Sequence, residues 1–137
     1  MIKQLNDVKE WQQIFGRNGH IVADDPIVID QDLAKYRVGF IAEECDEYLG
    51  ANDNNDLMEV IDALCDLQYF LYGMVVIHGM QDIFEEAFDI VHQSNMSKLE
   101  DGIVIIRESD GKVLKGKHYW GPKAKLQELI DNRTKNE

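Results

Sequence analysis

The sequence is poor in basic residues. Fourteen lysines and arginines stand against 26 aspartates and glutamates, so the net charge is −12. A surface that binds nucleic acid needs a basic patch, and this balance therefore argues against a nucleic acid polymer as the partner. A nucleotide remains an acceptable substrate, because metal ions can bridge acidic side chains to phosphate groups.

Cysteines and long apolar runs are also scarce. Cys45 and Cys65 lie among apolar residues without a CxxC spacing, which predicts reduced thiols in the core. The apolar run from Leu67 to Ile77 is too short and too interrupted to span a bilayer. The first residues contain no hydrophobic segment of a signal peptide. We therefore expect a soluble, cytoplasmic protein without membrane contact.

The length of 137 residues fits one domain, and a hydrophobic content of 45% is ample for a core. Helical spacing of apolar residues predicts an all-α bundle of four to five helices over about residues 4–98. Residues 99–137 should form a small β-hairpin, with its turn at Ser109–Gly111, and a tail with a short last helix after Pro122.

Capping residues predict where the helices begin and end. The expected N-caps are Asn6, Asp30 or Asp32, Asp56 and Asp82. The expected stops are Gly16, Gly50 and Gly79.

Two of these helices, separated by the polar loop 50–55, carry carboxylates that interrupt apolar rows: Glu43, Glu44, Asp46 and Glu47 on the first, and Glu59, Asp62 and Asp66 on the second. The second helix is apolar around nearly all of its circumference, which predicts that it is buried. A buried carboxylate needs a partner, but no Lys or Arg occurs between Phe40 and Met80. A divalent cation is the simplest remaining partner. For Glu59 alone, a capping box with Asp56 is an alternative role.

Facing carboxylate rows suit Mg²⁺ or Mn²⁺, which prefer oxygen ligands and leave positions open for water and phosphate. Such a site favours hydrolysis of a phosphate bond, with a spare carboxylate to accept the proton of the attacking water. A di-iron bundle would need Glu-x-x-His motifs on two helices. The nearest match is Asp89-x-x-His92, which lies away from the acidic rows.

Basic and aromatic residues supply candidate contacts to a substrate. Arg37, two turns before Glu44, would contact either a substrate phosphate or an acid. Asn95 and Lys98 end an apolar helical row. Either this end of the helix reaches a solvent-filled cleft, or the helix frays here and its dipole favours the positive charge of Lys98. A last group of basic and aromatic residues would either contact the base and phosphates of a nucleotide or pack the hairpin against the helices. It comprises Lys115, Lys117, His118, Tyr119 and Trp120.

The acidic motifs resemble those of the all-α nucleoside triphosphate pyrophosphohydrolases, the MazG-like and phosphoribosyl-ATP pyrophosphohydrolase-like proteins. Their ExxE and ExxD signatures match Glu44-x-x-Glu47 and Glu59-x-x-Asp62, with Glu43 as an additional acid. Three later segments are similar to the tail of small, including phage-encoded, members: 94–98, 110–116 and 119–122.

The resemblance implies a homodimer or homotetramer whose core is completed by other subunits, and Mg²⁺- or Mn²⁺-dependent cleavage of a (d)NTP to monophosphate and pyrophosphate. It implies metal binding by Glu43, Glu44, Glu47, Glu59 and Asp62, with one of the glutamates (Glu43, Glu44 or Glu47) or its metal-bound water activating the nucleophile. It also implies that Asn95 and Lys98 contact the nucleotide. Asp66 is kept as a further candidate ligand, because it too precedes an apolar run.

The leading hypothesis is therefore a metal-dependent nucleotide pyrophosphohydrolase. The competing hypothesis is a non-catalytic acidic helical module that binds a protein partner or a nucleotide. The two differ in the placement of the acids, because a partner-binding acidic face would be exposed, whereas these acids interrupt apolar rows.

Overall fold

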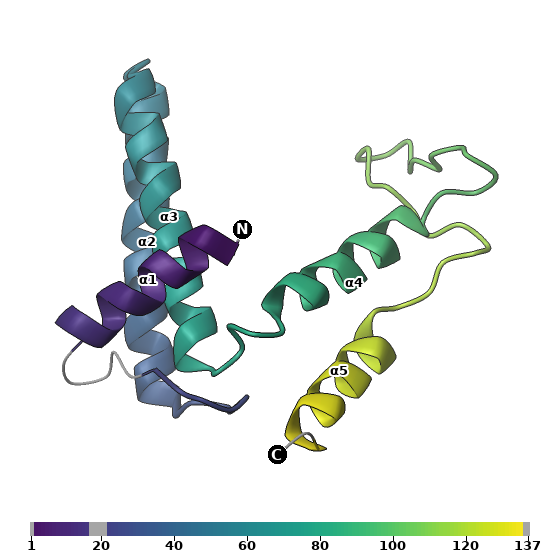
Figure 1. Cartoon of the computed structure of the whole chain (residues 1–137). Helices are drawn as coiled ribbons and strands as arrows, with labels where there is room; N and C mark the ends of the chain where they lie inside the picture. Colours follow the sequence, from purple (N-terminus) through teal and green to yellow (C-terminus); the bar gives the residue numbers. More distant parts are fainter. Residues whose placement is uncertain (1, 17–21, 136–137) are drawn as a thin grey trace. The chain divides into compact units, whose positions relative to one another are not determined.

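The computed structural model of the chain describes residues 2–16 and 22–135. These residues form five α-helices: α1 (Ile2–Phe15), α2 (Gln31–Asp53), α3 (Leu57–Ile77), α4 (Phe84–Met96) and α5 (Lys123–Lys135) (Figure 1). No extended strand occurs among the described residues. The predicted all-α class is confirmed.

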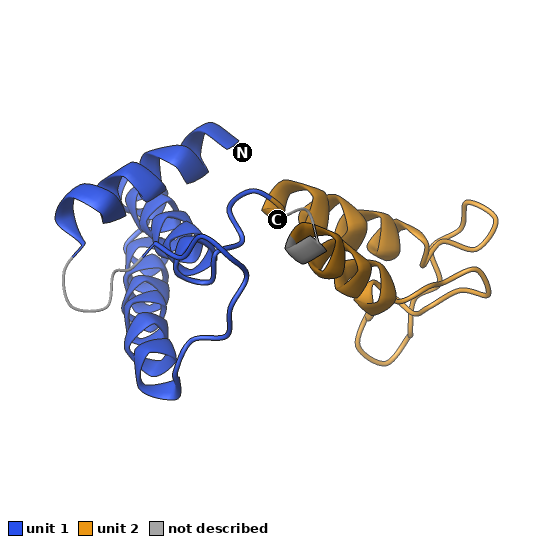
Figure 2. Ribbon diagram, turned by 60° about the horizontal axis from the view of Figure 1, so that its bottom comes forward, with its two compact units in different colours: residues 1–82 blue, residues 83–137 orange. Residues whose placement is uncertain are grey.

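The chain divides into two compact units, Met1–Asp82 and Ile83–Glu137 (Figure 2). The first contains α1, α2 and α3, and the second contains α4 and α5. The prediction of one domain, with a bundle to about residue 98 and a tail after it, stays a prediction. Within the second unit α4 bonds to the C-terminal segment: Ser94 Oγ donates to the Trp120 carbonyl at 2.9 Å, and Gly116 N–H donates to the Lys98 carbonyl at 3.1 Å.

In the first unit, α2 and α3 run antiparallel and α1 lies across α3 (Figure 1). The carboxylate of Asp30 caps α2 by accepting from two backbone N–H groups at 3.1 and 3.0 Å, which selects Asp30 over Asp32. Asp56 caps α3 in the same way, at 3.1 and 3.2 Å. The end of α3 is also as predicted, because Gly79 has the left-handed φ of 67° that favours glycine after a helix.

Three predicted boundaries are wrong. The first helix begins at Ile2 rather than near Asn6, and Lys3 Nζ bonds to Asp7 across its first turn at 2.6 Å. The helix α2 continues through Gly50 to Asp53, and the left-handed residue of the turn is Asn55, with a φ of 60°. Asn tolerates this conformation because its side chain bonds locally. The N-cap of α4 is Ile83, a buried residue, rather than Asp82.

The core of the first unit lies around the C-terminal half of α3. Tyr72, Val75, Val76 and Ile77 are all at most 3% exposed, and Val8 of α1 is buried as well. The N-terminal half of α3 is different, since its apolar side chains are exposed in the single chain: Leu57, Met58, Ile61 and Leu64. Because Tyr69 and Leu71 are exposed too, the predicted burial of this helix holds only for its end, residues 72–77.

The cysteine prediction is correspondingly half right. Cys45 and Cys65 are free, but both side chains are exposed rather than part of the core. Cys65 lines the open hollow of about 630 Å³ between α1 and α3, so its neighbours leave it accessible.

By length and composition alone, α3 could cross a membrane. A buried core helix has the same properties, and this one carries Glu59, Asp62 and Asp66, which are costly in lipid.

In the second unit, α4 and α5 lie side by side (Figures 1 and 2). The expected hairpin lies in the segment that connects these two helices. It has two backbone hydrogen bonds of 2.8 Å: Arg107 N–H donates to the Lys112 carbonyl, and Leu114 N–H donates to the Ile105 carbonyl. Gly111 makes its turn with a φ of 71°. The pairing is limited to an isolated bridge between Ile106 and Val113, too little to form strands.

Candidate functional site

The carboxylates of α2 and α3 converge on Glu44. Burial raises the pKa of Glu44 above its ordinary value of 4.5, and so do the negative charges around it, in decreasing order those of Glu47, Asp66, Asp62 and Glu43. We call these five residues the acidic cluster. Helical spacing explains the arrangement, because Glu44 and Glu47 on α2, and Asp62 and Asp66 on α3, are each three or four residues apart.

Within the cluster, only Glu44 is partly buried. The side chains of Glu43, Glu47, Asp62 and Asp66 are exposed, as is that of Glu59. The expectation that all these acids point into a core is therefore wrong for the single chain. Leu57, Ile61 and Leu64 of α3 are exposed as well, so the single chain forms little core around these acids.

The carboxylate of Glu59 is not among the charges that raise the pKa of Glu44. Its backbone N–H donates to Asp56 at 3.2 Å, the first half of the capping arrangement considered for it.

The cluster nonetheless has the chemistry of a divalent-cation site. Among the described residues, none of its carboxylates pairs with Lys or Arg. The Oε2 atom of Glu44 is buried and accepts no hydrogen bond there. A donor set made only of carboxylates suits Mg²⁺ or Mn²⁺. However, no three His, Cys, Asp or Glu side chains in the described ranges lie close enough together to hold an ion. Metal binding by these residues stays a prediction.

Arg37 lies deep in the first unit and is only 3% exposed. Its Nη2 donates to Oε1 of Gln12, itself 2% exposed, at 3.0 Å. Gly73 of α3 makes room for this pair, because a Cβ there would stand 2.1 Å from Nη2 of Arg37 and 2.6 Å from Oε1 of Gln12. Burial lowers the pKa of Arg37, but a guanidinium remains protonated in proteins. The alternative in which Arg37 pairs with an acid of the cluster does not hold, because these acids form no ion pair with any described residue.

Arg37 also lines a pocket of about 380 Å³ between α1, α2 and α3. Its other lining residues are Val8, Trp11, Gln12, Phe40, Asp66, Tyr69 and Phe70. Asp66 thus belongs both to the acidic cluster and to this pocket. A larger hollow of about 630 Å³ between α1 and α3 has mostly apolar walls and contains no residue of the cluster.

Aromatic rings form the walls of the smaller pocket. Phe40 and Phe70 stack with ring centroids 5.0 Å apart and planes 6° apart, and Trp11 meets Tyr69 edge to face at 6.1 Å. The sequence had pointed to neither these aromatic residues nor Gln12 as part of a site. The signal it lacked was the position of α1, because the pocket exists only where this helix crosses the other two.

The remaining predicted substrate contacts lie in the second unit, where they contact one another. Lys98 Nζ donates to Asn95 Oδ1 at 2.8 Å, and Lys115 Nζ lies 4.7 Å from the centre of the Tyr119 ring. The ring of Trp120 is covered by Lys125 at 4.0 Å.

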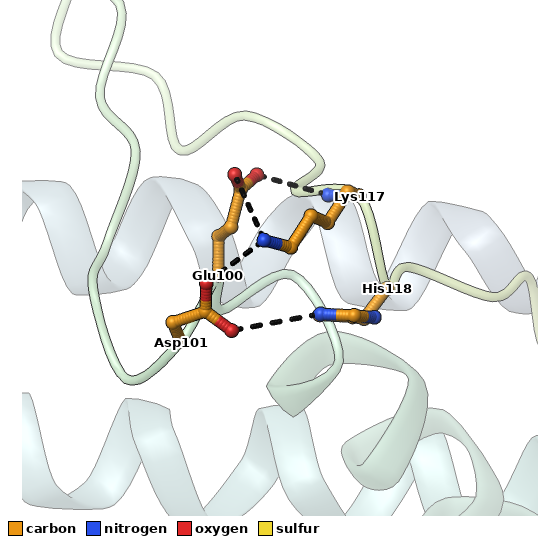
Figure 3. A network of polar contacts seen from close by, with 4 residues as sticks. All are labelled: Glu100, Asp101, Lys117 and His118. Atoms are coloured by element: carbon orange, nitrogen blue, oxygen red, sulfur yellow. Dashed lines mark hydrogen bonds and ion pairs between the residues drawn. The ribbon is translucent and has the colours of Figure 1, made fainter.

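Lys117 is part of a polar network with Glu100, Asp101 and His118 (Figure 3). Its Nζ lies 2.8 Å from Asp101 Oδ2, and its backbone N–H donates to Glu100 Oε2 at 3.0 Å. His118 Nε2 is 3.6 Å from Asp101 Oδ1. These contacts organise the loop after the hairpin; a role of the second unit in nucleotide binding stays a prediction.

Comparison with known proteins identifies the family. The phosphoribosyl-ATP pyrophosphohydrolase family profile matches residues 8–95, which include α2, α3 and the whole acidic cluster. The chain belongs to this family. The resemblance found in the ExxE and ExxD motifs is thereby confirmed.

Two further proteins are similar to this chain. A crystal structure from Exiguobacterium sp. 255-15, provisionally named an NTP pyrophosphohydrolase, is 28% identical, has a TM-score of 0.55, and matches over 97% of this chain and 96% of that one. An uncharacterised protein of Acanthamoeba polyphaga mimivirus is 32% identical over 74 residues. That match spans 53% of this chain but only 30% of the viral protein. Family and structural neighbour together point to a pyrophosphohydrolase.

Proposed function

We propose that this protein is a Mg²⁺- or Mn²⁺-dependent nucleoside triphosphate pyrophosphohydrolase that converts a (d)NTP or a related nucleotide to the monophosphate and pyrophosphate. The observation that carries the proposal is the convergence of acids from α2 and α3 on Glu44 without a Lys or Arg partner in the described part of the chain. Carboxylates gathered in this way repel one another, and a divalent cation would relieve that repulsion.

In this proposal Glu43, Glu44, Glu47, Glu59 and Asp62 hold the metal, with Asp66 as a further ligand. When bound, the ion would neutralise phosphate charge and favour departure of pyrophosphate. Water attacks phosphorus, the bond between the α-phosphate and the bridging oxygen to the β-phosphate breaks, and a glutamate accepts the water proton. Glu43, Glu44 and Glu47 are the candidates for that last role, and Glu44 has a buried oxygen that accepts no hydrogen bond among the described residues.

The second unit would supply further contacts to the nucleotide through Asn95, Lys98, Lys115, Lys117, Tyr119 and Trp120, and Arg37 would contribute from the first. A second copy of the chain would cover the exposed apolar half of α3, giving a homodimer or homotetramer. The site of action would be the cytoplasm.

The test is pyrophosphate release from standard and chemically modified (d)NTPs, with Mg²⁺ or Mn²⁺ and with a chelator. Glu47→Gln and Asp62→Asn should each abolish release while the circular dichroism spectrum stays unchanged. Asp46→Asn is the matched control, because Asp46 is exposed on the same helix and does not contribute to the shift at Glu44. Unchanged turnover in both site variants would refute the assignment.

The exposure of most cluster carboxylates favours a second candidate, a non-catalytic acidic module that binds a protein partner or a nucleotide. That function predicts no turnover of any nucleotide. It also predicts no rise in melting temperature when Mg²⁺ or Mn²⁺ is added.

A further inference from the structure

Two serines at the end of α4 hold the segment that follows the hairpin. Ser94 Oγ donates to the carbonyl of Trp120 at 2.9 Å, and the N–H of Trp120 donates to Ser97 Oγ at 3.2 Å. Ser97 Oγ in turn donates to the Ser94 carbonyl at 2.7 Å. Both backbone polar groups of Trp120 are therefore bound by hydroxyls that lie three residues apart, about one helical turn.

We propose that Ser94 and Ser97 are positioning residues for the triphosphate of the substrate. By holding Trp120 they fix residues 115–120 beside the end of α4, so that Lys98 and Lys115 bind the same phosphate chain. Neither serine contacts the substrate, because each hydroxyl proton is already used in a bond within the second unit. The inference rests on the proposed function, since it names residues that assemble part of its substrate-binding surface.

The other end of the segment is fixed to the turn that follows α4. Gly116 N–H donates to the Lys98 carbonyl at 3.1 Å, and a Cβ at Gly116 would stand only 2.8 Å from that oxygen. Lys117 N–H donates to Glu100 Oε2 at 3.0 Å (Figure 3). Residues 115–120 form neither helix nor strand. Hydrogen bonds at its two ends, rather than a regular backbone pattern, therefore give this segment its shape.

The chemical identity of Ser94 indicates that it serves a bond rather than packing. Ser94 is the buried residue of α4, with 3% of its surface exposed. An apolar side chain would fill a buried helical position without polar cost, whereas a buried hydroxyl needs a hydrogen-bond partner. That partner is the backbone of Trp120, so the position is used to hold the neighbouring segment.

The two segments that the serines join carry cations with neutral partners. Lys98 Nζ donates to the amide oxygen of Asn95 at 2.8 Å, and Lys115 Nζ lies 4.7 Å from the centre of the Tyr119 ring. Neither lysine forms an ion pair with any described residue. Both therefore keep their positive charge for a ligand.

The charge of the surrounding sequence favours an anionic ligand. Residues 111–127 contain five lysines and no aspartate or glutamate, although the whole chain has a net charge of −12. Of these lysines, Lys117 pairs with Asp101 at 2.8 Å and belongs to the network in Figure 3. A polyphosphate is attracted to such a stretch, because lysine binds phosphate as a point charge. The triphosphate is also the part that all (d)NTPs share.

Steady-state kinetics separate positioning from simple stabilisation. Ser97→Ala should raise KM for a (d)NTP roughly tenfold, the size of one hydrogen bond, and change kcat by less than about twofold, because the acidic cluster is unchanged. Ser97→Thr keeps the hydroxyl and should restore the wild-type KM. Ser109→Ala is the matched control, because Ser109 is exposed in the hairpin turn, and its KM should equal that of the wild type. A lower kcat at unchanged KM would overturn the inference, since it would mean only fewer folded molecules.

A binding measurement separates this inference from the proposed function. Inorganic tripolyphosphate carries three phosphate groups and no base, and its Kd with Mg²⁺ is measured by calorimetry. Wild type and Ser97→Thr should bind it equally, and Ser94→Ala and Ser97→Ala roughly tenfold more weakly. Ser97 is half-buried, so its variants provide the test even where Ser94→Ala, at a buried position, does not fold.

Equal affinity of wild type and Ser97→Ala, or no binding to the wild type, would overturn the inference. The expected order of affinities without turnover of any nucleotide would refute the proposed function alone. Nucleotide turnover in which Ser97→Ala keeps the wild-type KM would refute the role of the serines and leave the proposed function intact.

Discussion

A single methyl group at Gly73 should disturb the buried pair of Arg37 and Gln12. In Gly73→Ala the new Cβ would lie 2.1 Å from Nη2 of Arg37, well inside any van der Waals contact. The guanidinium must then move toward the pocket that it lines, and Oε1 of Gln12, 2.6 Å from the new Cβ, must move as well. We expect the 3.0 Å hydrogen bond to Gln12 to break.

Two opposing terms set the size of the effect. A hydrogen bond to a charged group contributes about 1.5–3 kcal/mol to stability. Replacing glycine by alanine within a helix adds back about 1 kcal/mol. The free energy of unfolding should therefore fall by roughly 0.5–2 kcal/mol, and at about 4 °C per kcal/mol the melting temperature should fall by about 2–8 °C.

The assay is thermal unfolding followed by circular dichroism at 222 nm, at one protein concentration. Gly39→Ala is the matched control, because Gly39 lies within α2 and a Cβ there would meet no atom within 4 Å. The control should melt roughly 2–4 °C above the wild type, from the helix propensity gain alone. If Gly73→Ala also melts at or above the wild-type temperature, the described packing of Arg37 against Gly73 is wrong.

Three further predictions concern charge and capping. Folding raises the pKa of Glu44, so the folded state binds a proton at this carboxylate more readily than the unfolded state does. The metal-free protein should therefore lose stability as the pH rises above about 4.5. Urea unfolding of Glu44→Gln should show a smaller loss; equal pH slopes would contradict the shift. Asp56→Ala removes two cap hydrogen bonds to α3 and should cost about 1 kcal/mol in urea unfolding, whereas Asp53→Ala should change stability by less than about 0.5 kcal/mol. Lys117→Ala should cost less than about 1 kcal/mol, because its ion pairs are solvent-exposed; a larger loss would show that the network in Figure 3 holds the second unit together.

The sequence by itself determined the helices, the N-caps of α2 and α3, and the acidic rows of these two helices. These features depend on local rules: helical spacing places Glu44 beside Glu47 and Asp62 beside Asp66, and Asp56 caps the helix that follows it. The order of the ExxE and ExxD motifs was also enough to indicate the family.

The tertiary structure alone decided how deeply each side chain lies and which distant residues meet. Arg37 was expected to contact a phosphate or an acid, but it is buried against Gln12 and Gly73, which come from two other helices. Cys65 lies among apolar neighbours in sequence yet is exposed. Burial and pocket shape depend on the path of α1 across α3, a contact between residues far apart in the chain, and periodicity within one helix carries no information about which helix will cover it.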